Sequence, residues 1–391
     1  MRSIRSMRRI GKTSVAQNAV GLNAFKSYNI GSLPEGCRQC VKGYKSVIFI
    51  TGRCPRTCFF CPVAAEKMYN DNMYCNEQKC ETFEQIIEEV RVSKSKGAGI
   101  TGGDPLCALK KTCDIIRLLK KEFGAHFHIH LYTSLNLVNE KNIQALADAG
   151  LDEFRVHPDL YDKTLWPRIS IPKGKFKKYG IEVPVIPYRE KALEELIDLG
   201  QQYIDYINLN ELEASCKNAA LFIARGLQVK QLSSYAIVGS QELGLRLAKK
   251  FGTRKFPIHY CTCKLKDAVQ LANRLKRRAH SIKRPLDFIT TEGTLYFGEV
   301  YIGNHDEAIK IMERVAKKHK IPARLYDVRE DRIVIASWVL IELANEFPGK
   351  KLLVTQYPTA DAMRVQEEEI GQNIESAQAH DASERIIYTT K

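Results

Sequence analysis

The chain has 391 residues, 44% of them hydrophobic, which excludes a disordered protein and a small disulfide-stabilised scaffold. Lys and Arg outnumber Asp and Glu by 60 to 45, and the net charge of +15 favours an anionic partner. The longest apolar run, 333–341, is too short to cross a bilayer, so no membrane partner is expected. Twelve cysteines without a signal peptide predict a cytoplasmic protein with reduced thiols, where clustered cysteines indicate metal binding.

The chain begins with a basic arm, residues 1–45, and continues from 46 to 283 with apolar runs that alternate with helical patterns. The runs predict strands at 47–51, 97–101, 126–133, 153–158, 181–187 and 204–210, with weaker ones at 229–238 and 256–261. Thr82 and Gln85 form a capping-box pattern at the start of one helical pattern. Repeated strand–helix units predict an α/β fold with parallel strands, as an open sheet or a partial or full (β/α) barrel. In such barrels the chemistry lies at the carboxyl ends of the strands.

The pattern changes at Arg284, where a small α+β domain is expected over residues 284–360. It begins with a hairpin that turns at 291–293, and a helix follows with Asn304 as its N-cap. Residues 361–391 are polar and of mixed charge, which predicts a mobile tail, or a helix followed by a loose tail.

The stretch "TGRCPRTCFFCPV" directly follows the first predicted strand and holds Cys54, Cys58 and Cys61. A closed zinc site usually takes four ligands in two separated pairs, and a disulfide would leave one of these three cysteines over. Three thiolates from one loop can instead hold three irons of a four-iron cluster and leave the fourth iron open. The spacing therefore favours a [4Fe-4S] cluster over a zinc ion or a disulfide.

This C-x₃-C-x₂-C loop, with Phe60 just before its last cysteine, resembles the signature of the radical S-adenosylmethionine (SAM) enzymes. The resemblance covers residues 36–260 and is strongest to the subgroup related to pyruvate formate-lyase activating enzyme, in its archaeal-type members. It implies that the open iron binds SAM and that one electron cleaves SAM to a 5′-deoxyadenosyl radical. It also implies an electron donor such as ferredoxin or flavodoxin, and a place for Phe60 against the adenine.

The stretch "AGITGGDPL" follows the second predicted strand and resembles the GGE-type motif of the same family, with Asp104 in place of Glu. The resemblance implies that Gly102 and Gly103 approach SAM with their backbone. Thr133 and Ser134 end the third strand and are further candidates for the SAM pocket. Taken alone, a Gly-Gly-Asp-Pro stretch is more often a simple turn.

Polar side chains on later strands complete the candidate SAM pocket. Arg155 and His157 lie two residues apart on the fourth strand, so they share one face and could meet the SAM carboxylate or a substrate. Asn208 and Asn210 end the sixth strand, where they could hold the ribose hydroxyls. A core histidine and helix-capping asparagines are equally acceptable interpretations, and no catalytic residue is identified.

A second metal site is expected from the remaining cysteines, because the first and last strands of a closed barrel are neighbours. The pair Cys37 and Cys40 precedes the first strand, and His259, Cys261 and Cys263 end the last. Together they could hold zinc or a second iron–sulfur cluster. The alternative is that they are ordinary buried thiols.

Three hypotheses for the function follow. The first is a radical SAM enzyme that acts on RNA, for instance tRNA, because thirteen of the residues 246–284 are Lys or Arg and one is acidic. The second is a radical SAM activase or peptide modifier, whose α+β domain grips a partner protein. The third is a zinc-stabilised nucleic-acid-binding protein without redox chemistry. A solvated basic face explains the charge as well as RNA does.

Overall fold

The computed structural model describes residues 21–231, 234–253 and 255–371. The chain divides into two units, which are taken separately below. Unit 1 consists of Met1–Val41, Ile48–Asn72 and Gly97–Val269, and unit 2 of Lys42–Val47, Met73–Lys96 and Gln270–Lys391. The first half of the predicted basic arm, residues 1–20, lies outside the described residues.

Unit 1 is built on a sheet with a parallel centre. Its strands are β1 (Gly21–Leu22), β2 (Tyr28–Ile30), β6 (Gly97–Thr101), β7 (His128–Ser134), β8 (Glu153–His157), β9 (Lys178–Val185), β10 (Tyr206–Glu211) and β13 (Ile258–Cys261). Strands β6, β7, β8, β9, β10 and β13 are parallel neighbours in that order. Strand β3 (Lys45–Phe49) enters this unit at Ile48, and Ile50 N then donates to Thr101 O beside β6.

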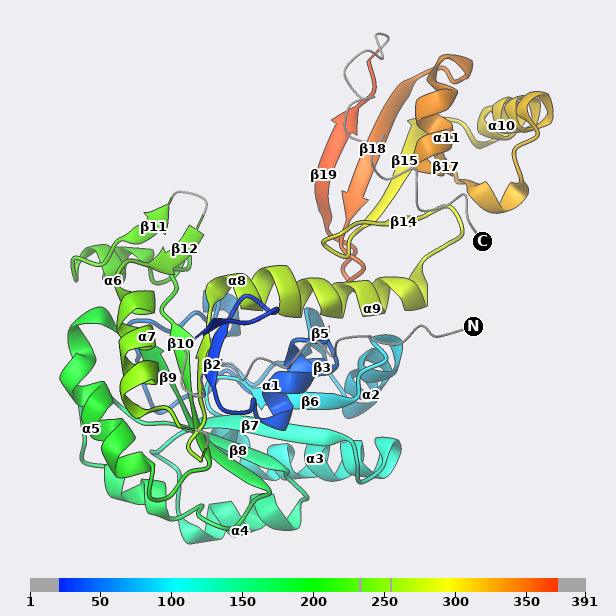
Figure 1. The fold of residues 1–391 in the computed structure, drawn as a ribbon. Coiled ribbons are helices and arrows are strands. Elements are labelled where there is room, and N and C mark those ends of the chain that lie inside the picture. Colours follow the sequence, from blue (N-terminus) through cyan, green and yellow to red (C-terminus); the bar gives the residue numbers. More distant parts are fainter. Residues whose placement is uncertain (1–20, 232–233, 254, 372–391) are drawn as a thin grey trace, which may run out of the picture. The chain divides into compact units, whose positions relative to one another are not determined.

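The α/β fold and its parallel strands are confirmed, and the sheet is an open, partial barrel. The last strand, β13, pairs antiparallel with β2, so its free edge is covered by the N-terminal hairpin β1–β2. The helices of unit 1 are α1 (Glu35–Cys40), α3 (Leu109–Phe123), α4 (Glu140–Asp148), α5 (Glu190–Gly200), α6 (Ala219–Ile223), α7 (Ser240–Phe251) and α8 (Cys263–Leu265). Figure 1 shows α3, α4 and α5 along the outer side of the strands.

The weak run at 229–238 is a hairpin rather than a strand of the main sheet, so that prediction is wrong. Strands β11 (Val229–Gln231) and β12 (Ser234–Ile237) form a separate two-stranded sheet, and Ala236 of β12 makes an isolated bridge to Glu213. The run consists of two short apolar stretches with polar residues between them, which suits a turn better than a continuous buried strand. Together with α6, this hairpin forms an insertion between β10 and α7 (Figure 1).

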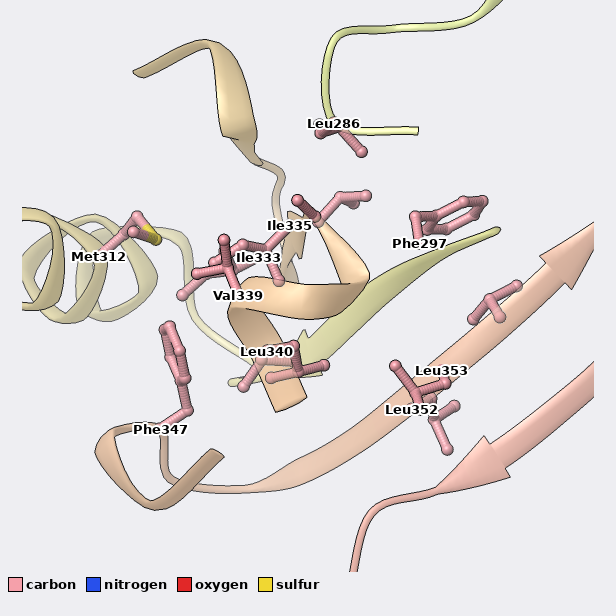
Figure 2. Packing of buried hydrophobic residues seen from close by; sticks show 14 of the residues in the cluster. Leu286, Phe297, Met312, Ile333, Ile335, Val339, Leu340, Phe347, Leu352 and Leu353 are labelled. Carbon is pink, nitrogen blue, oxygen red and sulfur yellow. The ribbon is translucent and has the colours of Figure 1, made fainter. Parts of the chain in front are cut away.

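Unit 2 contains a second, antiparallel sheet in the order β16-β17-β15-β18-β19, with β14 beside β15. Its strands are β14 (Phe288–Ile289), β15 (Leu295–Tyr301), β16 (Tyr326–Val328), β17 (Arg332–Ile335), β18 (Lys350–Gln356) and β19 (Arg364–Glu369). Its helices are α10 (His305–His319), which Asn304 caps as predicted, and α11 (Ser337–Glu342). Leu340 on α11 and Met312 on α10 belong to the buried core of this sheet (Figure 2).

Strand β19 lies where the sequence predicts a mobile tail. It pairs with β18 from Leu352 to Gln356 and extends the antiparallel sheet. Its acidic side chains are exposed, so its stability comes from ladder hydrogen bonds that composition does not reveal. The rest of the predicted tail, 372–391, lies outside the described residues.

Unit 2 also holds β4 (Met73–Cys75), β5 (Gln78–Cys80), α2 (Phe83–Val92) and α9 (Ala272–Ile282), which a π-helical turn, Lys266–Leu271, precedes. The predicted capping box of Thr82 and Gln85 is present at α2. Two of the arginines expected to present a basic face on α9 are instead paired. Arg278 is buried against Glu89, with Nε–Oε distances of 3.1 and 2.9 Å, and Arg274 pairs with Glu77.

Among the described residues, no helix has the length and hydropathy that a membrane span requires.

Candidate active site

The cysteine loop leaves the first central strand and folds back on itself. Cys54, Cys58 and Cys61 are partly exposed, and Cys61 N donates to Cys58 O at 3.1 Å in a tight turn. The three thiols are close enough for each to act electrostatically on another. Burial raises the pKa of Cys58 to about 11 and that of Cys54 above its usual range, so thiolates here require a bound cation at neutral pH.

Arg56, inside this loop, ties the cysteines to the carboxyl end of β8. Its Nη1 donates to His157 O at 3.0 Å and its Nη2 to Asp159 Oδ2 at 2.6 Å. The side chain of Arg56 is only 11% exposed, so this pair is shielded from solvent more than a surface ion pair is. We expect the guanidinium to hold the loop in place over the sheet.

The glycine pair after β6 lies directly against the cysteine loop. Gly103 N donates to Thr51 O at 2.8 Å, and Asp104 N donates to Arg53 O at 2.7 Å. A Cβ on Gly102 would lie 2.5 Å from Thr51 O, and one on Gly103 would lie 2.4 Å from Arg53 O. These positions therefore require glycine, because two backbone segments meet there. The two motifs singled out in the sequence are parts of one site.

Asp104 holds the glycine loop in place through hydrogen bonds to the end of β7. Its carboxylate is buried and accepts from Thr133 Oγ1 at 2.7 Å, from Ser134 Oγ at 2.6 Å and N at 3.0 Å, and from Leu106 N at 3.0 Å. Asp104, Thr133 and Ser134 thus bond to one another, whereas the sequence placed all three around SAM. Their hydrogen bonds lock the end of β6 to the end of β7 and so position the glycine backbone.

Phe60 and His157 lie together above the end of β8. Their ring centroids are 5.6 Å apart with an interplanar angle of 34°. Burial, with the nearby charge of Arg56, lowers the pKa of His157 to about 4, so its imidazole is neutral at pH 7. The pair offers a flat, uncharged surface beside the last cysteine of the loop, which is consistent with the adenine contact expected of Phe60.

Arg155 is committed to a buried network instead of presenting a free guanidinium. It bonds to Glu153 and, from Nη1, to Glu182 Oε2 at 2.7 Å. Burial acts to lower the pKa of Arg155, but the charge of Glu153 holds that pKa above its usual range. Glu182 in turn accepts from Asn208 Nδ2 at 2.9 Å and Asn210 Nδ2 at 3.0 Å. The two asparagines expected to hold a ribose therefore hold a carboxylate.

Glu182, at the centre of this network, was missed by the sequence reasoning. Its signal is the single charged residue in the apolar run "IEVPVIP", because a lone carboxylate inside a buried strand needs partners. Helix α1 covers the same network. Gly36 N donates to Glu153 Oε2 at 2.9 Å, and a Cβ on Gly36 would lie 2.5 Å from Arg155 Nη2.

The second metal site is not supported. Cys37 is buried beside Arg155 and Asn208, and the Nε2 atom of His259 pairs with Ser27 Oγ at 3.1 Å. In residues 21–231, 234–253 and 255–371, no three His, Cys, Asp or Glu side chains gather around a point that one metal ion could fill. Cys37, Cys40 and Cys261 nevertheless lie close enough to act on one another electrostatically, so a second cluster stays a prediction that the comparisons do not support.

The same finding bears on the cysteine loop. Cys54, Cys58 and Cys61 are not arranged around a single ion, whose thiolate ligands would each lie about 2.3 Å from zinc. A four-iron cluster is broader than one ion and takes three thiolates from such a loop. The three thiols of this one loop, which lie close enough to act on one another, suit such a cluster, and the backbone of Gly102 and Gly103 lies beside the loop.

A cavity of about 400 Å³ opens next to the cysteine loop. Its walls include Arg56, Cys58, Phe60, Asp159, Tyr161 and Arg225. The walls carry both charged and aromatic side chains, which suits a ligand that has polar and apolar parts.

The insertion between β10 and α7 forms one wall of this cavity. Asn218 Nδ2 donates to Phe60 O at 3.3 Å, the Phe222 ring lies 5.7 Å from that of Phe59, and Arg225 lies over Phe59 at 4.3 Å. The sequence reasoning missed this role because it treated part of the insertion as a strand of the barrel.

A parallel sheet with a three-cysteine loop after its first central strand and a glycine pair after the second defines a class of enzymes that carry an iron–sulfur cluster. Comparison with known proteins agrees. The family model of the radical SAM superfamily matches residues 48–181, and a model described as "Domain of unknown function (DUF8061)" matches residues 293–370.

A protein of Methanocaldococcus jannaschii named "Putative glycyl-radical enzyme activating enzyme" is 36% identical over 365 residues, 89% of this chain and 96% of that protein. A "Probable GTP 3',8-cyclase" of Methanococcus aeolicus is 31% identical over 141 residues, 35% of this chain and 44% of that one. The match to the structure of methylornithine synthase covers 56% of this chain and 67% of that chain, with 14% identity and a TM-score of 0.38.

The chain belongs to the radical SAM superfamily. It is therefore a radical SAM enzyme, and the family implies a [4Fe-4S] cluster and SAM. The comparisons do not support the RNA-modification hypothesis. The hypothesis of a zinc-stabilised protein without redox chemistry is wrong, because the family is one of redox enzymes.

Proposed function

We propose that this chain is an activating enzyme that removes a hydrogen atom from a glycine of a partner protein. The observation that carries the proposal is the similarity to the M. jannaschii protein, which extends over 96% of that protein and 89% of this chain. Similarity over this length spans both the parallel sheet and the C-terminal domain, so it is more than a shared cofactor motif.

The surface around the cavity also supports a protein substrate. Five of the fourteen exposed large apolar side chains of the described residues lie on the insertion: Leu221, Ile223, Val229, Tyr235 and Val238. Two more, Tyr161 and Tyr188, lie beside the cavity, and their hydroxyls are 2.9 Å apart. Exposed apolar side chains gathered in this way are typical of protein-binding surfaces.

The proposal gives each residue of the site a role. Cys54, Cys58 and Cys61 hold the cluster, and Gly102 and Gly103 present their backbone to the amino group of SAM. The bound cluster supplies one electron, from a donor such as ferredoxin or flavodoxin, that cleaves SAM to methionine and a 5′-deoxyadenosyl radical. The neutral surface of Phe60 and His157 orients the adenine and keeps water away from it.

The cavity beside the loop then receives an extended segment of the partner. Arg225 at its wall donates to Leu221 O at 3.0 Å through Nη1, and its remaining donors face peptide carbonyl oxygens of the segment. A glycine of the segment held there would be placed to give up its Cα hydrogen atom to the radical that bound SAM would supply, leaving a glycyl radical and 5′-deoxyadenosine.

The proposal is tested by asking which molecules give up hydrogen. Cells are grown with glycine deuterated at Cα, and their protein, RNA and small-molecule fractions are incubated separately with the reconstituted, reduced enzyme and SAM. The proposal predicts deuterated 5′-deoxyadenosine from the protein fraction alone, together with an oxygen-sensitive radical signal on a protein. Cys58→Ala is the control for enzyme dependence. Transfer only from the RNA or small-molecule fraction would overturn the proposal.

A further inference from the structure

The C-terminal sheet of unit 2 carries a cavity of about 370 Å³ whose walls are rich in arginine. The charged side chains that line it are Arg284, Arg329, Arg332, Arg364, Asp287 and Glu299. None of the residues of the candidate active site lines this cavity, whose walls belong to unit 2 alone.

The cavity lies on the sheet face opposite helix α11. Phe297 and Glu299 lie two residues apart on β15, so they share one face of the sheet and line the cavity. Gly298, between them, lies on the other face, toward the helix. A Cβ on Gly298 would lie 2.6 Å from Leu340 Cδ2, so that face is closed by packing, and Leu340 lies in the core drawn in Figure 2.

The carboxylates at the cavity are covered by the arginines. The Asp287 side chain is 1% exposed and accepts from Arg284 N at 2.7 Å and Nη2 at 2.7 Å. The Glu299 side chain is 2% exposed and accepts two 2.9 Å bonds from Arg364 Nη2. The guanidinium groups of Arg284, Arg332 and Arg364 remain 30%, 25% and 31% exposed. The cavity therefore presents guanidinium edges over neutralised carboxylates.

Several guanidinium nitrogens are left for a ligand. Within the described residues, Arg284 uses Nε and Nη2, and Arg332 uses Nε and Nη1. Arg329 bonds only through Nε, to Asp327 at 3.2 Å. The outer carboxylates Asp327, Asp331 and Glu367 are 49%, 49% and 43% exposed, so water screens their charge more than that of the covered pair.

We propose that this cavity is an anion site that binds the phosphate or carboxylate group of a small molecule. The planar fork of arginine matches both groups by paired N–H···O bonds, and four arginines line this cavity. The proposal is independent of the activating function, because it concerns a different unit of the chain.

The test measures binding of inorganic phosphate to the full-length protein by equilibrium dialysis with labelled phosphate, under anaerobic conditions and at constant ionic strength set with KCl. Acetate and citrate compete in parallel arms. Arg329→Gln removes free donors and makes few internal contacts, and Arg332→Lys keeps the charge but loses the fork. Arg324→Gln, an exposed arginine of the same domain outside the cavity, is the control.

The proposal predicts one saturable site per chain, with affinity at least fivefold lower in Arg329→Gln and Arg332→Lys and unchanged in Arg324→Gln. Phosphate that outcompetes both carboxylates would identify a phosphate-bearing ligand, and the reverse order a carboxylate. Absence of saturable binding by any of the three anions would overturn the proposal, as would binding of equal strength in all three variants.

Discussion

Substitution of Asp104 by Asn leaves the size of the side chain almost unchanged but removes the negative charge of a carboxylate that accepts four hydrogen bonds. The carboxylate accepts from Thr133, Ser134 and Leu106 at distances of 2.6 to 3.0 Å and is 1% exposed. The amide oxygen of Asn can keep two of these bonds. Its NH₂ group then faces one backbone N–H that lacks an acceptor and one hydroxyl that must turn from donor to acceptor.

The cost follows from these two disrupted contacts. A buried donor without a partner costs about 1–3 kcal/mol, so Asp104→Asn is expected to cost roughly 2–4 kcal/mol of folding free energy. For a unit of this size the melting temperature falls by about 2–4 °C per kcal/mol, hence by about 5–15 °C. Because Asp104 also positions the glycine backbone, we expect a loss of SAM affinity of about tenfold or more in the reconstituted enzyme.

The assay is thermal unfolding of the apo protein under anaerobic conditions, followed by SAM binding to the reconstituted protein. Asp114→Asn is the matched control, because that carboxylate lies on the exposed side of α3 in pairs with Lys110 and Arg117. If Asp104→Asn melted within 1–2 °C of Asp114→Asn and bound SAM normally, the positioning role of Asp104 would be refuted.

Three further predictions concern packing, a buried ion pair and pH. Gly103→Ala should lower SAM affinity by at least tenfold in a binding titration, because its Cβ meets a backbone oxygen at 2.4 Å, whereas Gly21→Ala has open space and should change nothing. Arg155→Met should lower the free energy of unfolding by about 3–5 kcal/mol in a denaturant titration, because it leaves two carboxylates without their arginine partner. Lys163→Met, at an exposed ion pair, should lower it by at most about 1 kcal/mol. Burial lowers the pKa of His259 to about 4, below its unfolded value of 6.5. The folding free energy that this neutral histidine allows is present above pH 6.5 and falls by roughly 3 kcal/mol by pH 4. In urea unfolding between pH 7 and pH 4, His259→Asn should lose less stability than the wild type, and an equal loss would contradict the prediction.

The sequence predicted the elements whose signal is local. The apolar run of β6 was placed at 97–101, its observed bounds, and the caps Thr82 and Asn304 begin helices as their side-chain chemistry requires. The cysteine spacing and the glycine pair also carry their meaning within a few residues. The structure brings these two motifs together through two backbone hydrogen bonds.

The partners of polar side chains could not be predicted from local pattern. Arg155, Asn208 and Asn210 were expected to meet SAM, but they surround Glu182, which lies on a different strand. Their identities indicate only that an inward position is polar, and the partner depends on the register between strands. The second metal site stays a prediction, because Cys37 and Cys40 lie close enough to Cys261 to act on it electrostatically, although β2 covers β13.

The central claim is that Cys54, Cys58 and Cys61, with Gly102 and Gly103, form one cluster-and-SAM site. It is tested most directly by iron content and SAM cleavage in anaerobically reconstituted protein, with Cys58→Ala beside Cys216→Ala, an exposed cysteine elsewhere. The account predicts about four irons per chain, reductant-dependent 5′-deoxyadenosine in the wild type and Cys216→Ala, and neither in Cys58→Ala. Unchanged iron content and SAM cleavage in Cys58→Ala would contradict it.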